Sequence, residues 1–206
     1  MDEPHRPHRP ARYSDLTEMI DAAGGSANPG SRAEIASATA AIVVHAGRHR
    51  EGEADLVSLA DTVGIDTLAA LWRDADPVSL PGVLWAMYLL RQWCRTNGEE
   101  VMRLWRAGQP MAAADAVVAG VPDYPDVDAV RWVADAVLTG AYRGDFAVAL
   151  ERTAALFRVL AAGRRELADS ADAAEAAEEQ ERARRNERVA GGLTAAAARW
   201  RAGTLH

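Results

Sequence analysis

Three polar side chains at helical spacing are the first candidates for chemistry in this sequence. Residues 84–94 read LWAMYLLRQWC and hold two tryptophans, a tyrosine, a methionine and the only cysteine of the chain. On a helix, Tyr88, Arg91 and Arg95 share one face. A phenol beside two guanidinium groups could hold a phosphate or carboxylate, so these residues form a candidate site for a small anionic ligand. Alternatively, the face is a solvated rim whose arginines pair with nearby glutamates.

The residues that could act as nucleophiles or metal ligands lack the neighbours that such chemistry needs. Cys94 falls on the apolar side of the same helix, where burial raises the pKa of a thiol, and no histidine is adjacent in the sequence. His45 and His49 have the spacing of paired metal ligands, but Gly47 between them favours the end of a helix. The motifs H-E-x-x-H, E-x-x-H and C-x-x-C do not occur. We predict no catalytic residue, no cofactor and no metal site, with His45 and His49 as the remaining metal candidates.

The basic residues exclude two further classes of chemistry. All 23 are arginine. A Walker A loop and Schiff-base catalysis both need a lysine amine, so neither is possible here. A helix-turn-helix skeleton at 59–72 suggests DNA binding, but residues 51–76 contain seven acids and one arginine. Such a segment repels phosphates, and we expect no direct contact with nucleic acid.

Helix signals recur along the chain, and no period-two run of β-branched residues indicates a strand. We therefore predict an all-α protein, a single multi-helix domain of about seven to nine helices around the Trp-rich helix. A break is expected at Asn97-Gly98. The expected helix starts are Ser31 (with Glu34 as a capping box), Ser79, Asp126 and Asp145, and the expected ends include Gly47 and Gly140.

The Trp-rich helix is apolar around most of its circumference, which is typical of a helix packed on several sides. We expect it to form the core rather than a cofactor pocket, because pockets also need convergent polar groups. The tryptophans assigned to this core are Trp72, Trp85, Trp93, Trp105 and Trp132.

The chain divides into three parts by composition. Residues 1–12 carry three prolines and predict a disordered tail, and residues 13–167 form the helical core domain. Residues 168–206 are a charged C-terminal helix, expected to end at Gly191-Gly192, followed by a short terminal helix. The acidic stripe of this extension winds round its surface and leaves no fixed apolar seam, so the extension is predicted to be separable from the core.

The charged extension is also the predicted place for a protein partner. Its acidic block, with Glu178 and Glu181, could steer a basic surface. Glu178 is spaced to pair with Arg182, and Glu181 with Arg185. Trp200 either anchors the partner, since tryptophan is enriched among interface hot spots, or packs back on the core. The partner-binding candidates are thus Trp200, Glu178 and Glu181.

Two stretches resemble known sequences. TGAYRGDFAVALERTAALF, at 139–157, resembles the centre of a tetratricopeptide unit through Gly144-Asp145-Phe146 and Ala149. No second copy occurs, so this resemblance implies one helical hairpin and not a solenoid. LPGVLWAMYLLRQWCRTNGEE and GDFAVALERTAALFRV resemble small helical proteins of high-GC actinobacteria over about half of the chain. That resemblance implies no activity.

These observations predict a cytoplasmic protein. One cysteine and no signal-peptide pattern suit a reducing compartment. The longest apolar run, at 83–90, is eight residues, whereas a membrane span takes about 20. We expect a non-enzymatic helical protein-interaction or regulatory module with a protein partner. The alternative is a small anionic-ligand-binding protein or an enzyme whose site is Tyr88, Arg91 and Arg95.

Overall fold

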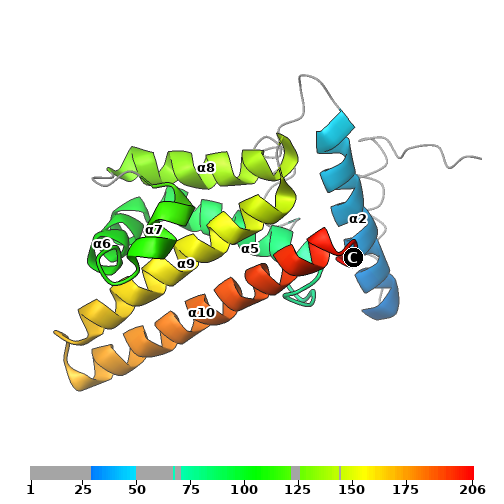
Figure 1. Ribbon diagram of the computed structural model, residues 1–206. Coiled ribbons are helices and arrows are strands. Elements are labelled where there is room, and N and C mark those ends of the chain that lie inside the picture. Colours follow the sequence, from blue (N-terminus) through cyan, green and yellow to red (C-terminus); the bar gives the residue numbers. More distant parts are fainter. Residues whose placement is uncertain (1–28, 50–66, 68–70, 122–125, 144) are drawn as a thin grey trace, which may run out of the picture.

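The computed structural model describes residues 29–49, 67, 71–121, 126–143 and 145–206 (Figure 1). These residues form seven helices and no strand, which confirms the predicted all-α fold. The tail predicted for residues 1–12 lies outside the described residues. None of the described helices is long and apolar enough to cross a membrane. The helices are α2 (Pro29–His49), α5 (Leu80–Thr96), α6 (Gly98–Gly108), α7 (Ala113–Ala119), α8 (Val127–Arg143), α9 (Phe146–Ala168) and α10 (Ala173–Arg201).

Three of the predicted helix starts are confirmed by their capping hydrogen bonds. The hydroxyl of Ser79 accepts from the backbone N–H of Gly82 at 3.3 Å. The carboxylate of Asp126 accepts from the N–H of Ala129 at 2.7 Å, and that of Asp145 from the N–H of Ala147 at 2.9 Å. Each bond satisfies a backbone donor that has no partner within its own helix.

The predicted bounds of α2 were wrong at both ends. The helix begins at Pro29, two residues before Ser31, and continues through Gly47 to His49. Proline suits the first turn because its missing N–H would have no intrahelical partner there. One glycine within a helix costs only about 1 kcal/mol, which need not end it.

Two helices share the centre of the molecule. The Trp-rich α5 packs against α2, α6, α8 and α10, as expected for a central helix. α9 contacts α6, α7, α8 and α10, and it runs alongside α10 for most of its length (Figure 1). Fifteen of its 23 residues are buried, many of them alanines. The hairpin implied by the tetratricopeptide resemblance corresponds to α8 and α9, which follow each other and are in contact.

Two glycines let α6 and α9 approach until their backbones nearly touch. A Cβ atom added to Gly163 would lie 1.9 Å from the carbonyl oxygen of Leu104. A Cβ atom added to Gly108 would lie 2.0 Å from the carbonyl oxygen of Val159. Each glycine therefore faces the main chain of the opposite helix, where no side chain fits.

The tryptophans divide into three groups by burial. Trp72 and Trp105 are fully buried, and Trp85 and Trp93 are half-buried against the core. The prediction for Trp132 was wrong, because 64% of this residue is exposed. Trp132 is exposed because it lies outside the buried face of α8. The residues of that face have the spacing of one side of a helix. They are Val130, Val133, Ala134, Val137 and Leu138.

The C-terminal extension is one helix, and the end expected at Gly191-Gly192 was wrong. α10 begins after Asp172, whose carboxylate accepts from two backbone N–H groups at 3.0 Å, and it runs unbroken to Arg201. The glycines disfavour a helix by about 1 kcal/mol each. The packing around them offsets this cost, because Ala190 and Leu193 on either side are buried in the core.

Candidate functional site

The structure separates the three residues of the predicted anionic-ligand site. Tyr88 and Arg91 are buried, with exposed fractions of 1% and 3%, whereas Arg95 is exposed. The Nε of Arg91 donates to the Asp135 carboxylate on α8 at 2.6 Å. A carboxylate at this distance offsets the cost of burying the guanidinium. Arg91 therefore belongs to the contact between α5 and α8, whereas the ring of Tyr88 lies 5.9 Å from that of Trp72. The solvated rim expected as the alternative extends only over Arg95.

The thiol of Cys94 lies in the same buried region. Burial, together with the negative charge of Asp135, raises the pKa of Cys94 to about 12. The thiol is thus neutral near pH 7, and a neutral thiol is a poor nucleophile and a poor metal ligand. Within the part of the chain that the structure describes, no group of three His, Cys, Asp or Glu side chains could hold a metal ion. The side chains of His45 and His49 lie outside this part.

A buried arginine joins four helices on the opposite side of α5. Arg164, on α9, lies over the ring of Trp93 at 5.2 Å from its centroid. Its Nη1 donates to Glu179 of α10 at 2.6 Å, and its Nη2 donates to Glu100 of α6 at 3.4 Å. Glu179 also accepts from Arg182 at 2.6 Å. Because both terminal nitrogens of Arg164 have carboxylate acceptors, this cluster fastens helices together. The Nε of Arg164 is also buried, and it has no hydrogen-bond partner among the described residues.

The cluster makes stability depend on pH through Glu179. Burial raises the pKa of Glu179, but the hydrogen bonds and charges of Arg164 and Arg182 lower it by a larger amount. The pKa of Glu179 therefore lies below its usual value. A lowered folded-state pKa contributes stability above the unfolded pKa of about 4.3, and that stability is lost as the pH falls through the folded value.

Glu179→Gln is therefore expected to lower the free energy of unfolding by about 2 kcal/mol at pH 7, because it removes the nearer of the two carboxylates that face the buried guanidinium of Arg164. The difference from the wild type should shrink as the pH falls below the unfolded pKa, because Glu179 itself then takes up a proton. Urea denaturation of both proteins at pH 7, 5 and 3 measures this effect. The contributions of the other carboxylates to the pH dependence cancel in the comparison, because both proteins carry them. A difference that stays constant over this range would contradict the assignment.

The predicted partner-binding residues are engaged within the molecule. The ring of Trp200 packs on Phe146 of α9, with 4.7 Å between the centroids, so the intramolecular alternative describes this side chain. Glu178 pairs with Arg182, as its spacing predicted. Glu181 pairs with Arg184 and Arg188 along α10, so the predicted pair with Arg185 was wrong.

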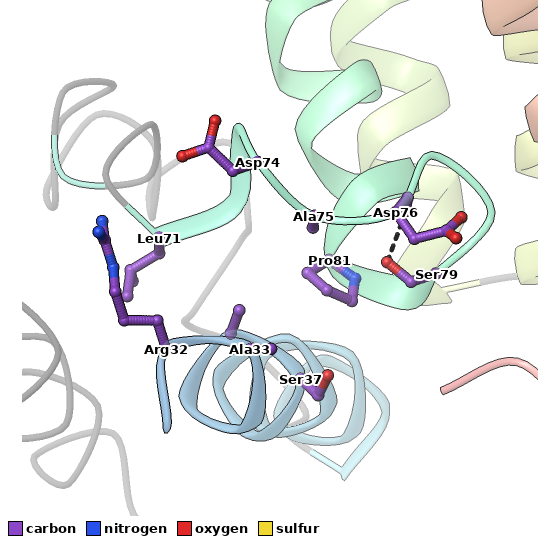
Figure 2. Close-up of a pocket in the computed structure, with 10 residues that line it drawn as sticks. Arg32, Ala33, Ser37, Leu71, Asp74, Ala75, Asp76, Ser79 and Pro81 are labelled. Carbon is purple, nitrogen blue, oxygen red and sulfur yellow. Dashed lines mark hydrogen bonds between the residues drawn. The ribbon is translucent and has the colours of Figure 1, made fainter. Parts of the chain in front are cut away.

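A cleft of about 400 Å³ lies between α2 and the segment 71–81 (Figure 2). Its polar side chains diverge, since Arg32 and Asp74 stand on one side and Asp76 and Ser79 on the other (Figure 2). Ser79 donates to the carbonyl oxygen of Asp76 at 2.6 Å, and the Asp76 carboxylate accepts from the N–H of Val78 at 2.7 Å. Ligand sites hold a small molecule with polar groups that converge on it, and these groups do not converge.

The most unusual surface surrounds the short helix α7. Three apolar residues are exposed there, with exposed fractions of 65% for Met111, 82% for Val117 and 50% for Val118. They adjoin a groove of about 350 Å³ that is lined by Gln109, Pro110, Ala113, Ala116, Val117 and Val121. We call Met111, Val118 and these groove residues together the α7 surface. A cluster of exposed apolar side chains is typical of an interaction site.

Polar contacts from α9 hold α7 in place. Arg152 donates from two nitrogens to the carbonyl oxygen of Ala119, at 3.2 and 3.3 Å. It thus provides a donor for a carbonyl group at the C-terminal end of α7. Arg158 donates to the Asp115 carboxylate at 3.1 Å. With these contacts on the inner side, α7 buries Ala116 and Ala119 and turns its two adjacent valines to solvent.

Sequence reasoning missed this surface. A short alanine-rich helix gives little periodic signal, and the expectation that larger apolar residues are buried would place Val117 in the core. The one available signal was Asp115, which lies two positions before Val117 and thus toward the other side of the helix. Had Asp115 been expected to face a partner inside the molecule, its spacing would have predicted that the valines face solvent.

Taken together, the described residues define an all-helical protein with an exposed apolar helix surface. No family model, no curated protein and no solved structure matches the chain.

Proposed function

We propose that this protein is a non-enzymatic interaction module of the cytoplasm that binds another protein through the α7 surface. The observation that carries the proposal is the exposure of Val117, Val118 and Met111 beside an apolar groove. Burying such side chains in an interface removes apolar area from water, which is the main favourable term in protein association.

The positions of the charged residues support a binding role over catalysis. Arg91 is held by Asp135, and Arg164 is held by Glu179 and Glu100. An anion at Tyr88, Arg91 and Arg95 would have to displace the half-exposed Asp135 carboxylate from the buried guanidinium of Arg91. Such an anion would only replace a charge interaction that Arg91 already has, which disfavours that alternative.

Capture from an extract of the source organism tests the proposal. The tagged wild type is compared with Val117→Asp, which places a charge on the α7 surface, and with Leu89→Asp as a matched control. Leu89 is an exposed apolar residue on α5. Because Val117 is largely exposed, its substitution should change the free energy of unfolding by less than about 0.5 kcal/mol.

We expect a protein that is enriched with the wild type and with Leu89→Asp and is lost with Val117→Asp. Mass spectrometry of the captured fractions and a denaturation curve for each variant provide the readouts. The same captured proteins with all three forms would contradict binding through α7.

A further inference from the structure

We infer that the α7 surface also joins two copies of this chain, with their α7 helices antiparallel across a two-fold axis. The inference goes beyond the proposed function, because the purified chain would form this pair without any other protein. It follows from the order of small and large residues along the exposed face of α7 and from the charge of that face.

One face of α7 is exposed and carries only alanine and valine. Its residues have the i, i+1, i+4, i+5 spacing of a single side of a helix. On the opposite side, Ala116 and Ala119 are buried where α7 packs on α9. The exposed face is small at its N-terminal end and larger at its C-terminal end. Its members are Ala113, Ala114, Val117 and Val118.

This order makes the face complementary to itself in an antiparallel pair. In a two-fold pair, residue i of one copy faces residue j of the other, and j faces i. With the axis near the middle of the helix, Val117 of each copy would lie opposite Ala114 of the other, and Val118 opposite Ala113. Each valine would then meet an alanine, and the two helices could pack closely. A parallel pair would instead set valine against valine and alanine against alanine.

The residues that flank this face continue the pattern. Met111 is exposed before the helix, and Gly120, which has no side chain, is exposed after it. The same antiparallel register would place Met111 of one copy over Gly120 of the other. The groove of about 350 Å³ has Ala113 in its lining, so Val118 of the second copy would enter this groove. Each copy would thus supply both the projecting side chains and the spaces that receive them.

The charge of the surface permits contact with an identical surface. Residues 110–121 include one charged residue, Asp115, and Arg158 donates to its carboxylate at 3.1 Å. Although each copy has a net charge of −7, two copies meeting here would not set unpaired like charges against each other. The exposed charged residues of the neighbouring α6 are of both signs: Glu99, Arg103 and Arg106.

The apolar character of the surface favours a second copy over a different protein as the occupant. Homodimer interfaces are more apolar than the interfaces of transient complexes between different proteins. The area is small, however, because α7 has only seven residues, whereas a standard interface buries about 800 Å² on each partner. We therefore expect a weak dimer that forms near 100 µM and dissociates near 1 µM, both values being about tenfold estimates. A tighter-binding partner would displace the second copy.

Sedimentation equilibrium of the purified full-length chain, from about 1 to about 100 µM, tests the inference. The wild type is compared with Val117→Asp and with Leu89→Asp, which adds the same charge at an exposed apolar residue outside α7. We expect the wild type and Leu89→Asp to dimerise equally. Val117→Asp should weaken the dimer at least about tenfold, because the carboxylate would be buried against an alanine with no partner.

A second set of variants tests the antiparallel register. Ala114→Val sets valine against valine, and Val117→Ala sets alanine against alanine, so each alone should weaken the dimer about fivefold or more. The chain with both substitutions restores a valine opposite each alanine. An equal mixture of the two single variants restores the same pairs between unlike copies. Both should dimerise within about threefold of the wild type, and circular dichroism of each variant checks that the fold is unchanged.

Three results would overturn the inference: a wild type that stays monomeric over the whole range, a dimer that Val117→Asp leaves intact, and a double variant that dimerises no better than the single ones. The capture experiment decides separately whether the proposed function stands. A monomeric wild type that captures a different protein through Val117 would overturn the inference and support the proposed function.

Discussion

Replacing Gly163 by alanine is expected to lower the free energy of unfolding by about 3 kcal/mol or more, a large effect for one added methyl group. The added Cβ would lie 1.9 Å from the carbonyl oxygen of Leu104. This neighbour is main chain within α6 and cannot turn aside as the end of a flexible side chain could. α6 and α9 would have to move apart, and the packing along their whole contact would loosen.

Gly191→Ala is the matched control, and its expected effect has the opposite sign. Gly191 is exposed within α10, and a Cβ atom there would meet no heavy atom within 4 Å. Alanine should therefore stabilise the helix by about 0.5–1 kcal/mol through helix propensity alone. Urea denaturation of both variants gives the comparison. A gain in stability for both would show that the close approach of α6 and α9 is not as described.

Three helix starts were predictable because a cap is a local signal, although the capping box predicted at Ser31 lies inside α2. Ser79 and Asp145 each accept from a backbone N–H two or three residues later, and the sequence shows the acceptor and the helix together. The end of a helix was harder to predict where glycine alone marked it. Gly47, Gly140 and the pair Gly191-Gly192 all lie inside helices, so none of the ends predicted there was right.

The burial of the polar residues could not be read from local sequence. Arg91 meets a carboxylate 44 positions away, and Arg164 meets one that is 64 positions away. Helical spacing placed Tyr88 and Arg91 on a shared polar face, but it could not show that Asp135 of α8 would meet Arg91 or that Trp72 would pack on Tyr88. Long-range pairing depends on how helices pack, and no pattern within one helix contains that information.

The α7 surface was missed for a related physical reason. Hydrophobicity predicts which residues can be buried, but the available partners decide which of them are. α7 buries the small Ala116 and Ala119 because α9 lies close to it, and the larger Val117 is left in solvent. The same selection buries Val133 of α8 and exposes its neighbour Trp132.

Removing α10 is expected to abolish the cooperative unfolding transition, in contrast to the separable extension predicted from the sequence. Leu193, Ala196 and Ala197 are buried in the core, and Trp200 packs on Phe146. A buried leucine alone contributes about 1.5–3 kcal/mol. Since whole domains are stable by about 5–15 kcal/mol, the loss of this face would leave α9 and α5 without a sufficient core.

Polar contacts at the end of the chain add to this loss. Arg199 donates to the carbonyl oxygen of Val78 at 3.3 Å, and the N–H of Leu80 donates to the carbonyl oxygen of His206 at 2.8 Å. Both contacts hold the segment from which α5 begins. Truncation would thus expose the apolar side of α9 and also release the start of the Trp-rich helix.

Thermal unfolding followed by circular dichroism tests this expectation on a chain truncated after Ser170. Leu193→Ala weakens the same contact without removing the helix, and it is expected to lower the free energy of unfolding by about 2–5 kcal/mol. Arg185→Ala is its control on the exposed side of the same helix and should change stability by less than about 0.5 kcal/mol. A truncated chain that melts cooperatively at the wild-type midpoint would mean that the core is complete without α10. Trp200 would then be available to a partner, and the α7 surface would have a rival as the binding site.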